Sequence, residues 1–205
     1  MFVCENEKFR VDNFGFVNST KKGVKNIKTD YIFKEELEHI LSTLMPPNRL
    51  ALEVSLSTGL RLSDVLSLKT QQVKQRFTIQ EQKTGKTRKV YIPAELLERM
   101  LMQAGSIYIF PHRLDGRKHR TRQAVWKDIR RSAELFRIPK NLVISPHTCR
   151  KVFAVNQFQT KGSLKAVQEL LNHSSEGVTF IYAMADVLTE QKLKGSRYSV
   201  RKRNN

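Results

Sequence analysis

Apolar side chains recur at helical spacing along most of the chain. In KEELEHILSTL, residues 34–44, the leucines and the isoleucine fall on one face of a helix. The same period predicts further helices at about 49–58, 93–104, 122–136, 147–160, 164–171 and 175–184. We expect the Pro46-Pro47 pair to end the first helix, and Gly59 to end the second in a left-handed conformation.

Two short runs follow a different period. FTIQEQ (77–82) and RKVYIP (88–93) alternate apolar and polar side chains, and turn residues around Thr84-Gly85 separate them. This pattern predicts a β-hairpin. IYIF (107–110) and FGFV (14–17) are candidates for short strands. The expected fold class is therefore mainly α with a small antiparallel β-sheet, an α+β domain.

Three segments are expected along the chain. Residues 1–28 are polar and basic without a sustained apolar period, which is typical of an arm or linker. A folded domain is predicted for residues 29–185, and a C-terminal segment for residues 186–205. From Lys192 onward the chain has six basic residues and no acid, so we expect this tail to be mobile unless it meets DNA or another subunit.

The charge balance points to a polyanionic partner. Lysine and arginine total 37 against 19 acids, which gives a formal charge of +18 and a pI near 10.2. Nucleic acid fits this excess better than a membrane surface. The sequence has neither a long apolar run nor an apolar signal core, so we expect a soluble, cytoplasmic protein without a membrane partner.

The two cysteines are too few and too far apart for a disulfide framework or a zinc module. Cys4 and Cys149 stand alone in the sequence. Cys149 lies two positions after His147, and side chains at that spacing on a helix point to different faces. We therefore expect Cys149 to be a small buried residue and not a nucleophile.

Three motifs in the C-terminal half carry chemistry: SPHTCRK, LLNHSS and FIYAM. His147 and Arg150 are three positions apart at a helix start, so they share a face near free backbone N–H groups that favour a phosphate. His173 lies where a helix gives way to a loop, and Tyr182 follows nine residues later. Each residue alone is ordinarily structural, but their combination in a basic protein favours a phosphate site. If a tyrosine is the nucleophile of this site, Tyr182 is the first candidate and Tyr198 in the basic tail is its rival.

Two upstream residues complete the group. Arg61 follows the glycine that ends a helix, and Ser63 is expected to cap the next helix, with Asp64 in its first turn. Lys83 is expected at the hairpin tip, where Lys86 is an alternative.

These residue types suit attack on a DNA phosphodiester. Guanidinium groups match the two non-bridging oxygens, a phenol is a nucleophile once positive charge or a base assists it, and a lysine or imidazole protonates the leaving oxygen. The sequence has no grouped carboxylates for magnesium and no GxxxxGK[ST] loop for a nucleotide. A covalent phosphotyrosine conserves the bond energy, so no metal, ATP or other cofactor is expected.

Five motifs in one order resemble the catalytic domain of the tyrosine recombinases, the phage integrase family. They are TGLRLSDVLSL, the KTG hairpin, HTCRKVFA, VQELLNHSS and the following tyrosine, between about Thr29 and Ala185. The resemblance implies the tyrosine recombinase catalytic-domain fold. It also implies that strands are exchanged between two double-stranded DNA sites within a tetramer, and that a C-terminal segment is exchanged between subunits. A bacterial or phage origin is implied as well.

The resemblance assigns roles to six candidate catalytic residues: Arg61, Lys83, His147, Arg150, His173 and Tyr182. The arginines would clamp the scissile phosphate, and the histidines would assist by hydrogen bonding and proton transfer. The lysine would protonate the 5′-leaving oxygen, and the tyrosine would form a 3′-phosphotyrosyl bond.

The chain departs from the family pattern at three places. Cys149-Arg150-Lys151 stands where the family usually has leucine, arginine and histidine, and Asn172 replaces a common glycine. The family also carries about a hundred more N-terminal residues that clamp DNA. Either this is a compact recombinase or it is the catalytic part of a longer protein. A type IB topoisomerase-like activity and a non-catalytic DNA-binding regulator are the alternative functions.

Overall fold

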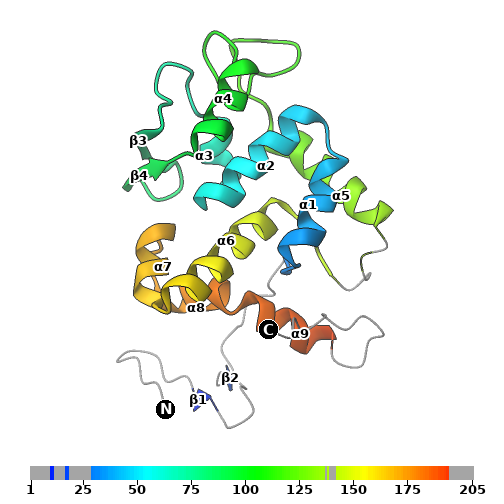
Figure 1. Ribbon diagram of the computed structural model, residues 1–205, viewed down its shortest axis with the longest axis vertical. Coiled ribbons are helices and arrows are strands. Elements are labelled where there is room, and N and C mark those ends of the chain that lie inside the picture. The colour runs from blue at the N-terminus through cyan, green and yellow to red at the C-terminus, as the bar shows by residue number, and fades with distance from the viewer. Residues whose placement is uncertain (1–9, 12–16, 19–28, 137, 139–141, 194–205) are drawn as a thin grey trace.

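Helices dominate the computed structural model, which describes residues 10–11, 17–18, 29–136, 138 and 142–193 (Figure 1). The helices are α1 (Lys34–Ser42), α2 (Pro46–Thr58), α3 (Leu62–Leu66), α4 (Ala94–Met102), α5 (Arg122–Leu135), α6 (Pro146–Lys161), α7 (Leu164–Leu171), α8 (Glu176–Ala183) and α9 (Ala185–Leu193). β1 (Arg10–Val11) pairs with β2 (Val17–Asn18), and β3 (Arg76–Gln80) pairs with β4 (Thr87–Tyr91), both antiparallel. The mainly helical fold with a small antiparallel sheet is confirmed.

Helix α6 joins the two halves of the domain. In Figure 1, α2, α3, α4 and the β3–β4 hairpin lie above it and α1 and α5 lie to its right, while α7 and α8 lie beside its lower part. Helix α6 packs against α2 in the main core and against α7 and α8 on its other side. There a small cluster of Phe153, Ala154, Val167 and Leu171 is buried, and Tyr182 packs against it. Packing on α6 therefore fixes α7, α8 and the loop between them.

Three local predictions were wrong. Pro46 and Pro47 begin α2 and do not end α1, because proline at the first helical positions lacks only an N–H that has no partner there. Arg61, and not Ser63, is the N-cap residue of α3, since the helix already starts at Leu62. IYIF forms no strand, and its Tyr108 makes only an isolated bridge to Lys69.

The predicted arm and tail fall largely outside the described residues. Within residues 1–28 only β1 and β2 are described, so of the FGFV strand candidate only Val17 can be compared, and it belongs to β2. At the other end, α9 packs on its own domain: Thr189 Oγ1 accepts a hydrogen bond from the backbone N–H of Tyr31 at 3.0 Å, and Leu193 is buried. Residues 194–205 lie outside the described part of the chain.

Gly59 ends α2 in the left-handed conformation, with φ +67°, as predicted. A Cβ at this position would lie 2.5 Å from two ring carbons of Phe153. Gly59→Ala should therefore lower the free energy of unfolding by about 2–4 kcal/mol, the sum of backbone strain and overpacking. Urea denaturation measures this.

Gly162 provides the matched control. It ends α6 with φ +63°, but a Cβ there meets nothing within 4 Å. Gly162→Ala should cost only the backbone strain, about 1 kcal/mol. Equal losses for the two variants would show that contact with Phe153 does not restrict residue 59.

Candidate active site

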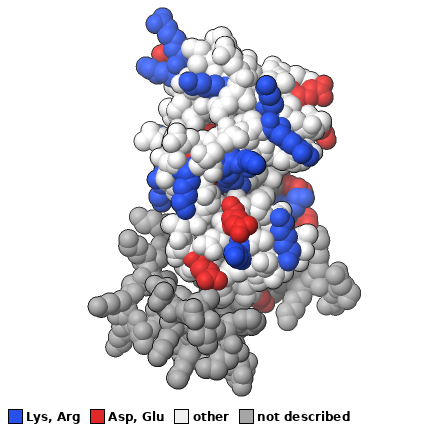
Figure 2. Space-filling model, turned by 90° about the vertical axis from the view of Figure 1, so that its left-hand side faces the viewer, with Lys and Arg blue, Asp and Glu red and all other residues white. Residues whose placement is uncertain are grey.

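All six candidate side chains line one cleft of about 1250 Å³. Its walls come from the start of α3, the turn of the hairpin, the start of α5, the start of α6 and the segment from His173 to Tyr182. The charged lysine and arginine residues on these walls are Arg61, Lys83, Arg122 and Arg150, and no described Asp or Glu is among the lining residues. Figure 2 shows many Lys and Arg side chains on the face that carries the hairpin and α7. This cleft suits a polyanion.

A capping box fixes the start of α6. Ser145 Oγ accepts a hydrogen bond from the backbone N–H of His147 at 3.3 Å, and Thr148 Oγ1 accepts one from the backbone N–H of Ser145, also at 3.3 Å. Thr148 Oγ1 donates in turn to the carbonyl of Asp30 at 3.0 Å. His147 opens onto the cleft, and Arg150 lies one turn further into it.

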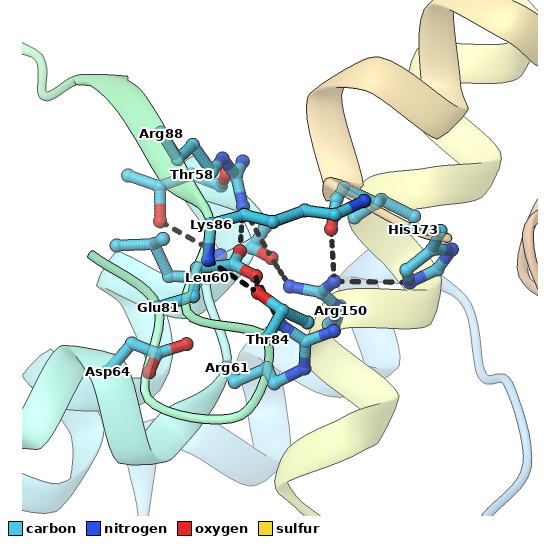
Figure 3. A network of polar contacts seen from close by, with 12 residues as sticks. Thr58, Leu60, Arg61, Asp64, Glu81, Thr84, Lys86, Arg88, Arg150 and His173 are labelled. Atoms are coloured by element: carbon cyan, nitrogen blue, oxygen red, sulfur yellow. Dashed lines mark hydrogen bonds and ion pairs between the residues drawn. The ribbon is translucent and has the colours of Figure 1, made fainter. Parts of the chain in front are cut away.

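Arg150 is the anchor of the site, because backbone groups from two other segments hold its guanidinium. Its side chain is 1% exposed, and it donates to the carbonyls of Gly59 and Leu171 and to Nε2 of His173 (Figure 3). Three of its five N–H donors are thus used among the described residues, which leaves two for a ligand. Burial, and then the charge of Arg61, lowers the pKa of Arg150 to about 10, so it stays cationic at neutral pH.

The hydrogen bonds of His173 define its tautomer. Arginine can only donate, so Nε2, 3.1 Å from Arg150 Nη2, is the acceptor. The ring proton therefore sits on Nδ1, which lies 3.1 Å from Thr179 Oγ1. Asn172 before it adopts φ 54°, the left-handed conformation expected for the residue that replaces the family's glycine. His173 thus supports Arg150 in the free protein.

Both imidazoles of the cleft are neutral near neutral pH. Burial, and then the charges of Arg150 and Arg61, lowers the pKa of His173 to about 3. Burial within the cleft, followed by the charges of Arg150 and Arg122, lowers the pKa of His147 to about 4. His147 keeps considerable solvent contact, so the neighbouring cations are the firmer reason for its shift.

This shift of His173 predicts an acid-labile fold. The ordinary pKa of a histidine is 6.5, and in the folded chain that of His173 is about 3. Between these two pH values the unfolded chain binds more protons at this ring than the folded chain does. The stabilisation is fully present above pH 6.5 and is lost on acidification. Urea denaturation at pH 7 and at pH 5 should show that the free energy of unfolding falls by on the order of 1 kcal/mol between them. The fall should be smaller in His173→Gln. Identical losses in both proteins would contradict this prediction.

Tyr182 is the cleft's nucleophile candidate. Its ring lies edge-on to His173, with centroids 5.1 Å apart. Burial raises the pKa of Tyr182, although the charges of Arg150 and Arg61 oppose this. The phenol is therefore neutral in the free protein and must lose its proton during attack. Among the described tyrosines only Tyr182 lines the cleft, while Tyr198 lies outside the described residues.

Arg61 and Lys83 approach the cleft from the other half of the domain. Arg61 Nη1 donates to Glu81 Oε2 at 2.6 Å. Lys83 is exposed on the hairpin turn and lines the cleft, whereas Lys86 is not among the described residues that line it. The turn position predicted for Lys83 is therefore confirmed.

Sequence reasoning missed two buried charged residues beneath the cleft, Glu81 and Arg88. Arg88 Nη2 donates to the carbonyl of Thr58 at 2.5 Å, and Nη1 lies 3.7 Å from Glu81 Oε1. The alternation of β4 contained the signal, because Arg88 shares its buried face with Val90.

Cys149 matches the expectation of a small buried residue. Cys149 is fully buried, and burial raises the pKa of its thiol to about 12, so the thiol is inert.

No described helix is both long and apolar enough to cross a bilayer. Among the described residues no cluster of three or more His, Cys, Asp or Glu side chains is arranged to hold a metal ion.

Residues 30–188 match the phage integrase family. This chain belongs to that family. It is 28% identical over 173 residues to tyrosine recombinase XerD of Staphylococcus saprophyticus, covering 72% of this chain and 56% of the relative. It is 26% identical over 186 residues to the integrase of Escherichia phage P2, covering 85% of this chain and 52% of the relative. The chain thus spans about half the length of these relatives.

Solved structures share the fold of this integrase-family chain. XerA recombinase matches with a TM-score of 0.64 at 18% identity, covering 85% of this chain and 66% of that one. XerH recombinase bound to its difH substrate, a post-cleavage complex, matches with a TM-score of 0.64 at 24% identity, covering 90% and 58%. The catalytic domain of bacteriophage HP1 integrase matches with a TM-score of 0.55 at 20% identity, covering 82% and 95%. The predicted tyrosine recombinase catalytic-domain fold is confirmed.

Proposed function

We propose that this chain is the DNA-cleaving part of a site-specific recombinase or integrase that works through a 3′-phosphotyrosyl intermediate without metal or ATP. The observation that carries the proposal is the convergence of two arginines, two histidines, a lysine and a tyrosine on one basic cleft. Membership of the phage integrase family supports it.

Each side chain has a step in the proposed reaction. Arg61 and Arg150 bind the non-bridging oxygens of the scissile phosphate, where negative charge grows in the transition state. Tyr182 Oη forms a bond to phosphorus as the bond to the 5′-oxygen breaks. The phenolic proton passes to a neutral acceptor in the cleft, a role open to His147, because the acceptor nitrogen of His173 already receives a hydrogen bond from Arg150. Lys83 gives a proton to the departing 5′-oxygen, and rejoining reverses these steps.

The proposal includes partners and organisation beyond the cleft. The substrate is double-stranded DNA with a specific recombination site, and four chains assemble on two such sites in the synaptic complex. Residues 29–185 form the catalytic unit and residues 1–28 a basic arm. Residues 186–205, whose helix α9 packs on its own domain in the single chain, form the segment exchanged between subunits on assembly. The place of action is the cytoplasm of a bacterial cell, with the DNA of a host, phage or other mobile element.

Covalent capture of DNA tests the proposal and identifies the recombination site in the same experiment. A randomised pool of nicked duplexes, in which cleavage releases a short strand and traps the intermediate, is incubated with the full chain. Recovery of a defined sequence in a protein–DNA adduct is expected. Adducts on any sequence, together with relaxation of supercoiled plasmid, would favour a type IB topoisomerase-like enzyme. Binding without adducts would favour a non-catalytic regulator.

A further inference from the structure

A carboxylate is buried beneath the cleft where the hairpin meets α3. Glu81 follows β3, and its side chain has 0% exposure. Its Oε2 accepts hydrogen bonds from Arg61 Nη1 at 2.6 Å and from Thr84 Oγ1 at 2.9 Å. Figure 3 shows Glu81 at the centre of this network, with Arg88 on its other side. One oxygen atom thus joins an arginine of the cleft to the turn that carries Lys83.

Stability alone does not account for this arrangement. Moving a carboxylate and an arginine out of water costs about as much as their attraction returns, and apolar side chains of similar volume are often as stable. What the contact does provide is order. A long arginine side chain loses most of its rotamer freedom when it is fixed, and Glu81 fixes Arg61 before any ligand is bound.

The charge of Glu81 also balances a cluster of three arginines. Arg61, Arg88 and Arg150 surround the base of the cleft, and their mutual repulsion favours movement of the least buried one toward solvent. Arg61, with 15% of its side chain exposed, is the least buried of the three. The pKa values of Arg150 and Arg88, lowered chiefly by burial, are lowered further by Arg61, and Glu81 opposes both shifts.

We propose that Glu81 is a positioning residue for DNA cleavage. It holds the Arg61 guanidinium, and through Thr84 the Lys83 turn, in their working places before the phosphate arrives. This inference rests on the proposed function, because that function gives Arg61 and Lys83 a phosphate to act on. Preorganised donors stabilise a transition state without rearrangement at the moment of reaction, so loss of the anchor should slow cleavage and not binding.

Glu81→Gln tests the inference, because glutamine has the same shape but no charge. Covalent capture on the selected nicked duplex should become about 10- to 100-fold slower. DNA affinity should stay equal or increase, because the change removes a negative charge below the bound phosphate. A damaged fold would weaken both together. Thr84→Val, which frees only the turn, should slow capture less, by up to about tenfold.

Glu53→Gln is the matched control. Glu53 also accepts from two arginines, Arg49 at 2.7 Å and Arg99, but does not line the cleft. It should keep the wild-type capture rate. In an Arg61→Ala background, Glu81→Gln should cost much less than in the wild type, since the group it positions is gone. Capture within about twofold of wild type for Glu81→Gln, or an equal cost in both backgrounds, would overturn the inference.

Arginine side-chain NMR of the full chain without DNA gives a readout that does not depend on cleavage. The Arg61 Nε–Hε group should show restricted motion in the wild type and in Glu53→Gln. In Glu81→Gln the same group should move freely, so that its signal is averaged. An unchanged Arg61 signal in Glu81→Gln would overturn the inference even if cleavage is impaired. Should the wild type form no adduct, the proposed function fails, and the NMR comparison still decides whether Glu81 orders Arg61.

Discussion

Tyr182→Phe is expected to abolish covalent capture of DNA and to leave DNA affinity nearly unchanged. The substitution removes one oxygen atom, the proposed nucleophile, and keeps the ring that packs edge-on against His173. Loss of a nucleophile should lower the rate by at least about 10⁴-fold, since no other described tyrosine lines the cleft. The measurement is adduct yield on the selected nicked duplex, with affinity determined on the intact duplex.

Tyr198→Phe is the matched control for this experiment. It makes the same chemical change at the rival tyrosine of the basic tail and should leave the adduct yield unchanged. Loss of adducts in Tyr198→Phe with normal yield in Tyr182→Phe would move the nucleophile to the tail.

Because burial raises the pKa of Tyr182, the wild-type rate should also increase with pH until the phenol ionises.

Local patterns were sufficient to predict much of this fold. The alternation of the hairpin strands and the glycine between them gave the β3–β4 pairing and the position of Lys83, because strand period and turn chemistry are properties of adjacent residues. The bounds predicted for α7, residues 164–171, agree with the structure, and Gly59 adopts its predicted left-handed conformation. Pro46 was misread because proline suits the residue after a helix and the first residue of one equally well.

Distant contacts are what the sequence could not reveal. Arg150 was predicted as a phosphate ligand, but its acceptor at Gly59 lies 91 positions away, and so its complete burial was not foreseen. Glu81 resembles a solvated charge near a hairpin tip until Arg61, 20 positions upstream, folds over it. Likewise, the tautomer of His173 depends on an arginine 23 positions away. A residue type suggests the chemistry, whereas its protonation and orientation depend on neighbours that only the fold supplies.

Arg150→Ala should impair both stability and cleavage. It leaves the buried carbonyl of Leu171 without its Arg150 donor and the carbonyl of Gly59 with only the 3.4 Å hydrogen bond from Arg88 Nη1, which should lower the free energy of unfolding by roughly 3 kcal/mol. It also removes a guanidinium from the phosphate site, which should slow covalent capture by roughly 10²- to 10³-fold. Urea denaturation and adduct formation, the latter at a temperature where the variant is folded, measure the two effects separately.

Two further variants separate the chemical loss from the structural one. Arg120→Ala removes another buried arginine, which donates to Asn48 and is not among the cleft-lining residues. It should lose stability while the folded protein still captures DNA at the wild-type rate. Arg150→Lys keeps the positive charge but lacks the fork that bridges two carbonyls and a phosphate, so its capture should stay slow. Wild-type capture by Arg150→Lys would mean that charge alone suffices. Slow capture by folded Arg120→Ala would mean that lost stability, and not a lost phosphate contact, explains the Arg150→Ala defect.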